Sequence, residues 1–317
     1  MIAHRIRFLV LRGGAIGDFL VTLPALRAIR ERWPEAYIEC IGYPHIAQLG
    51  VAGGLLNRVE SLDRAGMAAF FARPPTFTEE QTEKIRSFQV IFSWLHDSNG
   101  TVRENLLLAG ARQVVYGSPL IPAGCHATDH LFAPLAELAL YPEDLVPILT
   151  LDSATRAAGR DWLRARQWDD ATHVVHPGSG SPRKNWPLDR FVPLIEIISR
   201  ECGAPPLIVL GEADAPLRQP LLAACPDARL VEQLTLTELA GVMSQVPNYV
   251  GNDSGVTHLA AALGLRVIAL FGPSNAVQWA PKGKQVTLLQ APSGDMADID
   301  LNEVVHASVT EWSAREQ

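Results

Sequence analysis

Three turns rich in glycine and charge carry the residues of this 317-residue chain that are best suited to chemistry. The last of them, GNDSG at residues 251–255, leads into an apolar stretch that contains His258. Such a strand–turn–helix pattern presents free backbone N–H groups to anions. We expect Ser254 and Gly255 to donate to phosphate, and Asp253 and His258 to hold a sugar. Structural roles stay open for two of them, an N-cap for Asp253 and a packed imidazole for His258.

The first turn places Asp18 just behind three glycines, Gly13, Gly14 and Gly17. Asp18 either complements the dipole of the following helix or acts as a general base at a strand end. The glycines would let a bulky substrate approach the backbone closely. Glu39 lies where the ribose-binding acid of a dinucleotide site is expected, but Arg12 stands where that fingerprint requires glycine.

The middle turn, residues 176–187, contains two hydroxyls, Ser179 and Ser181, and the cation Lys184. A lysine there can neutralise a diphosphate leaving group as a compact point charge. The alternative is an ordinary connecting loop on the surface. We expect Trp186 to pack in the core and anchor the turn. Glu212 follows the next strand and a glycine, where a carboxylate can accept both hydroxyls of a ribose.

Composition favours a globular protein of two domains, with 48% hydrophobic residues, 19% charged residues and a net charge of −7. This balance argues against a nucleic-acid partner, which needs a basic surface. We interpret the dispersed cysteines as free thiols of a reducing cytoplasm and expect no metal site: Cys40, Cys125, Cys202 and Cys225. No signal peptide or membrane span is predicted, so we expect a cytoplasmic location.

The hydrophobic pattern predicts an α/β protein with parallel sheets and a domain boundary near residue 155. A helix over residues 18–32, ended by Trp33 and Pro34, and a loop over 74–83 are predicted in the first half. Strands are predicted at 6–11, 37–41, 89–94, 113–116, 173–176, 206–210, 248–251 and 266–271. Helices are predicted at 188–202 and 237–245, and another at 301–312.

These motifs together resemble glycosyltransferase family 9, the heptosyltransferases. The first is GGAIGD at 13–18 with TLPAL at 22–26, and the second runs from HPG at 176–178 to KNWP at 184–187. The third is GNDSG at 251–255 with HLAAA at 258–262, and HATD at 126–129 is a weaker likeness. Their order and separation are more specific than a single glycine loop.

The resemblance implies a GT-B architecture, two Rossmann-like parallel-sheet domains facing across a cleft, with residues 1–155 binding the acceptor and 156–317 the donor. It implies inverting transfer of heptose from ADP-heptose to a lipopolysaccharide core precursor, without metal or cofactor. Asp18 would be the base and Lys184 would stabilise the leaving group. The implied donor-binding residues are Ser179, Ser181, Lys184, Glu212, Asp253, Ser254, Gly255 and His258. The glycolipid acceptor would draw the protein to the cytoplasmic face of the inner membrane.

Other classes remain open on the residues alone: a GT-B enzyme for another nucleotide sugar, a sugar-nucleotide epimerase, an NAD-dependent oxidoreductase, or a non-catalytic binding protein. Arg12 argues against the oxidoreductase, and Asp18 together with Lys184 argues against a binding protein. Asp298-Ile299-Asp300 has a DxD metal pattern, which we interpret as a solvated charge pair. Scattered arginines could meet an acidic acceptor but are usually surface charges: Arg58, Arg64, Arg103 and Arg112.

Overall fold

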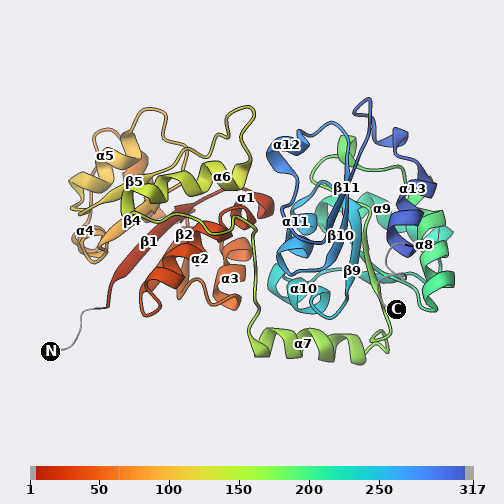
Figure 1. Cartoon of the computed structure of the whole chain (residues 1–317). Helices are drawn as coiled ribbons and strands as arrows, with labels where there is room; N and C mark the ends of the chain where they lie inside the picture. Colours follow the sequence, from red (N-terminus) through yellow and green to blue (C-terminus); the bar gives the residue numbers. More distant parts are fainter. Residues whose placement is uncertain (1–4, 64, 311–317) are drawn as a thin grey trace. The chain divides into compact units, whose positions relative to one another are not determined.

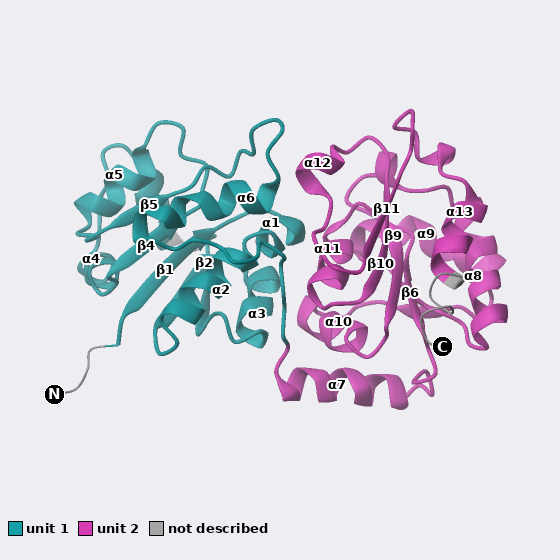
Figure 2. Cartoon of the chain, viewed as in Figure 1, with its two compact units in different colours: residues 1–150 teal, residues 151–317 magenta. Residues whose placement is uncertain are grey.

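The computed structural model describes residues 5–63 and 65–310, which form two compact units (Figures 1 and 2). The units are Met1–Thr150 and Leu151–Gln317. A boundary after residue 155 would fall inside α7 (Ser153–Arg164). That helix packs closely on α10 (Leu236–Met243) of the second unit, since a Cβ on Gly159 would lie 2.1 Å from the backbone of Gly241. The second unit therefore includes the whole of α7.

Unit 1 is a five-stranded parallel sheet with the strand order β3-β2-β1-β4-β5. Its strands are β1 (Arg7–Arg12), β2 (Tyr37–Gly42), β3 (Arg58–Ser61), β4 (Val90–Ser93) and β5 (Val114–Tyr116). Its α-helices are α1 (Ile16–Leu20), α2 (Leu23–Arg32), α3 (Pro44–Ala52), α4 (Glu79–Arg86), α5 (Thr101–Leu108) and α6 (Ala127–Phe132). The chain changes direction between the neighbours β1 and β4, so the turn after β1 lies where ligands of open α/β sheets bind.

Two predictions for unit 1 are wrong in detail. The helix over 18–32 is two helices, α1 and α2, separated at Val21 and Thr22, with Pro24 in the first turn of α2. Proline fits the first turn of a helix because its missing N–H has no intrahelical acceptor there. The expected loop over 74–83 ends early, because Thr78 accepts a hydrogen bond from the N–H of Gln81 and caps α4.

Unit 2 is a six-stranded parallel sheet with the order β11-β10-β9-β6-β7-β8. The strands are β6 (His173–His176), β7 (Leu207–Val209), β8 (Arg229–Val231), β9 (Asn248–Asn252), β10 (Arg266–Phe271) and β11 (Val286–Gln290). The further α-helices are α8 (Leu188–Cys202), α9 (Ala215–Ala224), α11 (Gly255–Ala262), α12 (Ala276–Trp279) and α13 (Leu301–Val305). The strand order reverses between β6 and β9, so the second and third glycine turns, which follow these strands, emerge at this reversal.

The core of unit 2 holds this sheet edge in place. Strand residues Val175, Val250 and Ile268 are buried in one cluster with Phe191 and Leu194 of α8. Apolar burial of this kind stabilises a fold by roughly 1.5–3 kcal/mol for each large side chain. The tail predicted as a helix over 301–312 begins as α13 and continues as a π-helical turn at His306–Thr310, and residues 311 and 312 lie outside the described residues.

No helix within residues 5–63 and 65–310 is both long and apolar enough to span a bilayer.

Candidate functional site

In unit 1, Asp18 is held by the turn that it follows. One carboxylate oxygen, Oδ2, accepts a hydrogen bond from the N–H of Ala15 at 2.8 Å. The other, Oδ1, lies 3.7 Å from Nη2 of Arg12. The side chain of Asp18 is still 31% exposed, so a substrate hydroxyl can reach it. This placement suits a general base and equally suits the first turn of a helix, where a carboxylate complements the dipole.

Arg12 supports the first turn, a role that the sequence did not reveal. Its side chain is 3% exposed, and Nη2 donates to the backbone oxygen of Asp18 at 2.6 Å. Nε donates to the Thr22 hydroxyl at 3.1 Å. Burial lowers the pKa of the Arg12 guanidinium, against the opposing charges of Asp18 and Cys40. Arginine retains its charge even so, and therefore fixes the start of α1 and the position of Asp18.

Gly14 is the glycine on which this turn depends. Its φ is +97°, and a Cβ there would lie 2.7 Å from Oδ2 of Asp18. We expect Gly14→Ala to destabilise unit 1 by at least about 1–2 kcal/mol, the cost of a left-handed alanine, and to displace Asp18. Gly13→Ala is the matched control, because its Cβ would meet only Leu62 and Leu95 at 3.5 and 3.8 Å. Thermal unfolding measures both variants, and equal melting temperatures would contradict this reading of Gly14.

In unit 2, the turns after β6 and β9 meet through an ion pair. Nζ of Lys184 lies 2.7 Å from Oδ2 of Asp253, with the lysine side chain 38% exposed and the aspartate 9% exposed. The N-cap reading of Asp253 is wrong, since Ser254 caps α11 by accepting from the N–H of Thr257. Two predicted site residues from distant parts of the chain thus form one charged pair.

Asn252 fastens the middle turn to β9. Its side-chain amide donates to the carbonyls of Pro177 and Gly178 at 2.9 and 3.2 Å, and its oxygen accepts from the N–H of Trp186 at 3.0 Å. Trp186 is the expected packing anchor, 1% exposed, with Nε1 donating to the carbonyl of Ile299 at 3.1 Å. The loop is therefore held in place by β9 and by the buried Trp186, and its role in a binding site stays a prediction.

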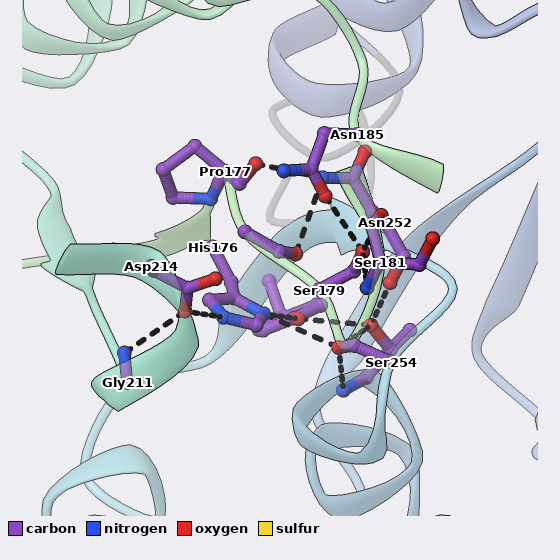
Figure 3. Close-up of polar contacts among 12 residues, drawn as sticks. His176, Pro177, Ser179, Ser181, Asn185, Gly211, Asp214, Asn252 and Ser254 are labelled. Atoms are coloured by element: carbon purple, nitrogen blue, oxygen red, sulfur yellow. Dashed lines mark hydrogen bonds and ion pairs between the residues drawn. The ribbon is translucent and has the colours of Figure 1, made fainter. Parts of the chain in front are cut away.

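The predicted hydroxyls Ser179 and Ser181 lie in this turn, where the Ser179 side chain serves the loop itself. Oγ of Ser179 lies 2.6 Å from the amide oxygen of Asn185 and 2.7 Å from the carbonyl of Ser181, and it accepts from the N–H of Ser181 (Figure 3). A role in phosphate binding for either serine stays a prediction.

A buried polar network beneath the turns was missed from the sequence. Nε2 of His176 lies 3.1 Å from Oδ2 of Asp214, and Nδ1 lies 3.2 Å from Oγ of Ser254 (Figure 3). Burial opposes ionisation of the Asp214 carboxyl, but His176 and the N–H groups of Gly211 and Ser179 outweigh it and lower the pKa. The histidine stands in the HPG motif, yet its aspartate partner comes from a different turn, after β7, which no spacing rule connects to it.

The other predicted donor residues differ in their surroundings. Glu212 is exposed, and its carboxylate makes no hydrogen bond or ion pair within the described residues, so it is open to a ligand. Gly255 is the first residue of α11, where backbone N–H groups point out of the helix. His258 is buried in the same helix, 6% exposed. Their roles toward ribose, phosphate and sugar stay predictions.

Both aspartates of the DxD-like pair are exposed, as expected of solvated charges, and each also makes a local contact. Asp300 caps α13, accepting from the N–H of Asn302 at 2.7 Å, and Asp298 accepts from the hydroxyl of Ser293. Among residues 5–63 and 65–310 no three acidic, histidine or cysteine side chains are grouped to hold a metal ion. No disulfide joins the four cysteines, all of which lie within the described residues.

Unit 1 also contains a cavity of about 290 Å³ that is lined by residues of β1, β2 and β3 and of α4. Leu11 and Phe70 belong to its apolar lining, and Lys84 and Glu60 to its charged lining. Nζ of Lys84 pairs with Glu60 and with the buried Glu39 at 2.6 and 2.7 Å. Glu39 is therefore committed to an ion pair within unit 1, which argues further against a ribose-binding role.

The arginines considered for an acidic acceptor differ in their surroundings. Arg58 pairs with Glu60 at 2.8 Å, and Arg103 and Arg112 are exposed. Arg64 lies outside the described residues.

His126 of the HATD motif caps α6, accepting from the N–H of Thr128 at 3.2 Å.

Comparison with known proteins gives consistent matches. Lipopolysaccharide heptosyltransferase 3 of Escherichia coli is 21% identical over 284 residues, which is 84% of this chain and 82% of that protein. Lipooligosaccharide heptosyltransferase 2 of Haemophilus influenzae is 27% identical over 125 residues, but this match spans just over a third of either protein, 37% of this chain and 36% of the relative.

Solved structures share the fold of the whole chain. A glycosyltransferase family 9 protein of Veillonella parvula has a TM-score of 0.79 at 17% identity, covering 100% of this chain and 99% of that one. ADP-heptose lps heptosyltransferase II of E. coli has a TM-score of 0.79 at 17% identity, covering 98% and 100%. These likenesses confirm the predicted class of two parallel-sheet α/β domains, the GT-B fold.

The sequence family described as "Glycosyltransferase family 9 (heptosyltransferase)" matches residues 120–306, which is more than half of the chain and includes the second and third glycine turns. The relatives and the fold agree with that match. The chain therefore belongs to glycosyltransferase family 9, the heptosyltransferase family, and is a glycosyltransferase.

Proposed function

We propose that this glycosyltransferase moves a heptose from ADP-heptose to a lipopolysaccharide core precursor, with inversion at the anomeric carbon. The proposal of a nucleotide-sugar donor rests on the pairing of Lys184 with Asp253 beside the N-terminus of α11. A cation, a carboxylate and unpaired N–H groups suit a diphosphate sugar, which needs positive charge and a hydroxyl acceptor. A solved relative, the E. coli heptosyltransferase WaaC, was determined with ADP.

The donor roles follow from the chemistry of each group. Lys184 and the N–H groups of Ser254 and Gly255 neutralise the diphosphate, and Ser179 and Ser181 line its turn. The exposed carboxylate of Glu212 accepts from the ribose hydroxyls, while Asp253 and His258 hold the heptose. Since Lys184 and the helix dipole supply the positive charge, the proposed reaction uses no metal or cofactor.

The reaction step needs a base on the acceptor. Asp18 takes the proton from an acceptor hydroxyl, whose oxygen attacks the anomeric carbon of the heptose. The bond from that carbon to the diphosphate breaks, and ADP leaves with the electron pair. Unit 1 supplies this base from its first turn, with Gly13, Gly14 and Gly17 letting the acceptor approach.

The acceptor is proposed to be a glycolipid of the lipid A and core type, met at the cytoplasmic face of the inner membrane. The support is that the relatives are lipopolysaccharide and lipooligosaccharide heptosyltransferases. Transfer is tested by incubating the protein with ADP-heptose and core glycolipids, each truncated just before one of the heptoses. Mass spectrometry then shows whether a glycolipid has gained the mass of one heptose.

The first experiment is thermal unfolding of the purified chain with ADP, UDP, GDP or NAD, each without magnesium. A ligand at 100 times its dissociation constant stabilises the folded state by about 2.7 kcal/mol. We expect ADP alone to raise the melting temperature. A response only to UDP or GDP would assign another nucleotide sugar, including an epimerase substrate, and a response only to NAD would overturn the proposal.

A further inference from the structure

The buried network beneath the donor turns fixes the position of protons. The Asp214 carboxylate accepts from the N–H of Gly211 at 2.9 Å and also faces Nε2 of His176 at 3.1 Å (Figure 3). An ionised carboxylate has no proton to donate. Nε2 of His176 must therefore carry the hydrogen of this contact. When the ring carries this hydrogen alone, Nδ1 is left as an acceptor.

Two hydroxyls, those of Ser254 and Tyr249, face Nδ1 on the opposite side of the ring, and the Thr257 hydroxyl lies within hydrogen-bond distance of both. Thr257 donates its proton to the carbonyl of Asn252. The Tyr249 hydroxyl is 2.9 Å from Oγ1 of Thr257 and 3.4 Å from Nδ1 of His176, so it donates to the nearer threonine. Oγ of Ser254 lies 3.2 Å from Nδ1 of His176 and 3.1 Å from Oγ1 of Thr257. Since Oγ1 of Thr257 already accepts from the Tyr249 hydroxyl, we assign the proton of Ser254 to Nδ1.

This arrangement turns the Ser254 hydroxyl inward. Its proton goes to His176, and its oxygen accepts from the N–H of Thr257 at 3.3 Å as the N-cap of α11. The hydroxyl is then occupied on both sides by the protein. The first N–H groups of the helix, at Gly255 and Val256, have no intrahelical acceptor and stay available to an anion.

Close packing shows that the network is built for this geometry. A Cβ on Gly178 would lie 1.8 Å from Oδ1 and 2.0 Å from Cγ of Asp214, so residue 178 must be glycine while the carboxylate is in place. A Cβ on Gly251 would lie 2.4 Å from the hydroxyl of Tyr249. Both glycines belong to the donor turns, which ties the shape of those turns to the buried groups.

We propose that His176 and Asp214 are positioning residues of the donor site. Asp214 holds His176 as the Nε2–H tautomer, and His176 holds Ser254 as the N-cap. Phosphate is therefore bound by the backbone N–H groups of Ser254, Gly255 and Val256 and not by the Ser254 hydroxyl. The statement about phosphate rests on the proposed function, whereas the tautomer does not.

Nitrogen NMR of the full chain with ¹⁵N-labelled histidine tests the tautomer without any ligand. The His176 signals are assigned by their loss in His176→Gln. We expect the ring hydrogen on Nε2 and a hydrogen-bonded Nδ1 without one, and in Asp214→Asn a shift of the proton toward Nδ1. A wild-type ring protonated at Nδ1, or at both nitrogens, would overturn the proposal even if the protein binds ADP.

ADP titration by calorimetry tests the positioning role. Asp214→Asn and Gly178→Ala should each weaken ADP binding about tenfold or more, the scale of one charge-assisted hydrogen bond. Gly180→Ala is the matched control in the same turn, because its Cβ would meet nothing within 4 Å. It should bind ADP within about twofold of wild type.

A purely structural role predicts a different pattern, in which both variants melt earlier but bind ADP with unchanged affinity when folded. That pattern would overturn the proposal. If Gly178→Ala fails to fold, the milder Asp214→Asn variant and the NMR signals still decide it. If wild-type protein does not bind ADP, the proposed donor fails while the tautomer is judged by NMR alone.

Discussion

Asp18→Asn should lower transfer by about 10²–10⁴-fold, the usual contribution of a positioned general base. The asparagine can still accept from the N–H of Ala15, as Oδ2 of Asp18 does at 2.8 Å, so the turn should keep its shape. What is lost is the group that removes the proton from the acceptor. The measurement is the steady-state rate of product formation with ADP-heptose and a core glycolipid.

Measuring ADP binding shows whether Asp18 acts as a base or as a group that binds the donor. ADP affinity should stay within a few-fold of wild type, because a base acts mainly in the transition state. Asp227→Asn removes one exposed carboxylate elsewhere and should leave the rate unchanged. Normal turnover of Asp18→Asn would exclude Asp18 as the base and leave it the role of complementing the helix dipole.

Much of the fold could be predicted from periodicity and turn chemistry. The strands His173–His176 and Arg266–Phe271 and the helix Leu188–Cys202 have the predicted bounds, because each is an apolar run between polar or glycine-containing turns. The peripheral strands β3, β8 and β11 were missed. They are short and partly exposed, so their sequences carry no continuous apolar signal.

In the candidate site, residues within a local motif could be predicted, whereas contacts between distant parts of the chain could not. Sequence motifs identified Lys184 and Asp253, and the structure brings them within 2.7 Å of each other. The partnership of His176 with Asp214 joins the turns after two different strands, and the sequence contains no spacing that would reveal it. Arg12 was missed for a similar reason, because an arginine in a strand gives no sign that it is buried and bonded to the next helix.

The second large effect is expected at Lys184. Lys184→Ala should weaken ADP binding about tenfold or more and slow transfer by about 10²–10³-fold, as when one donor to a developing negative charge is removed. Arg183→Ala is the matched control: it removes the same charge from the neighbouring exposed side chain and should change both quantities by less than about twofold. Unchanged affinity and rate in Lys184→Ala would place its ammonium on the solvent side.

The ion pair with Asp253 allows stability and catalysis to be separated. Lys184→Ala leaves a carboxylate that is 9% exposed without its cation, and such a charge is costly to keep buried. Adding Asp253→Asn to Lys184→Ala should therefore restore part of the lost melting temperature, because the neutral amide needs no counter-ion. It should not restore transfer, since the positive charge opposite the diphosphate is still missing. Recovery of both together would mean that Lys184 serves the fold and not the leaving group.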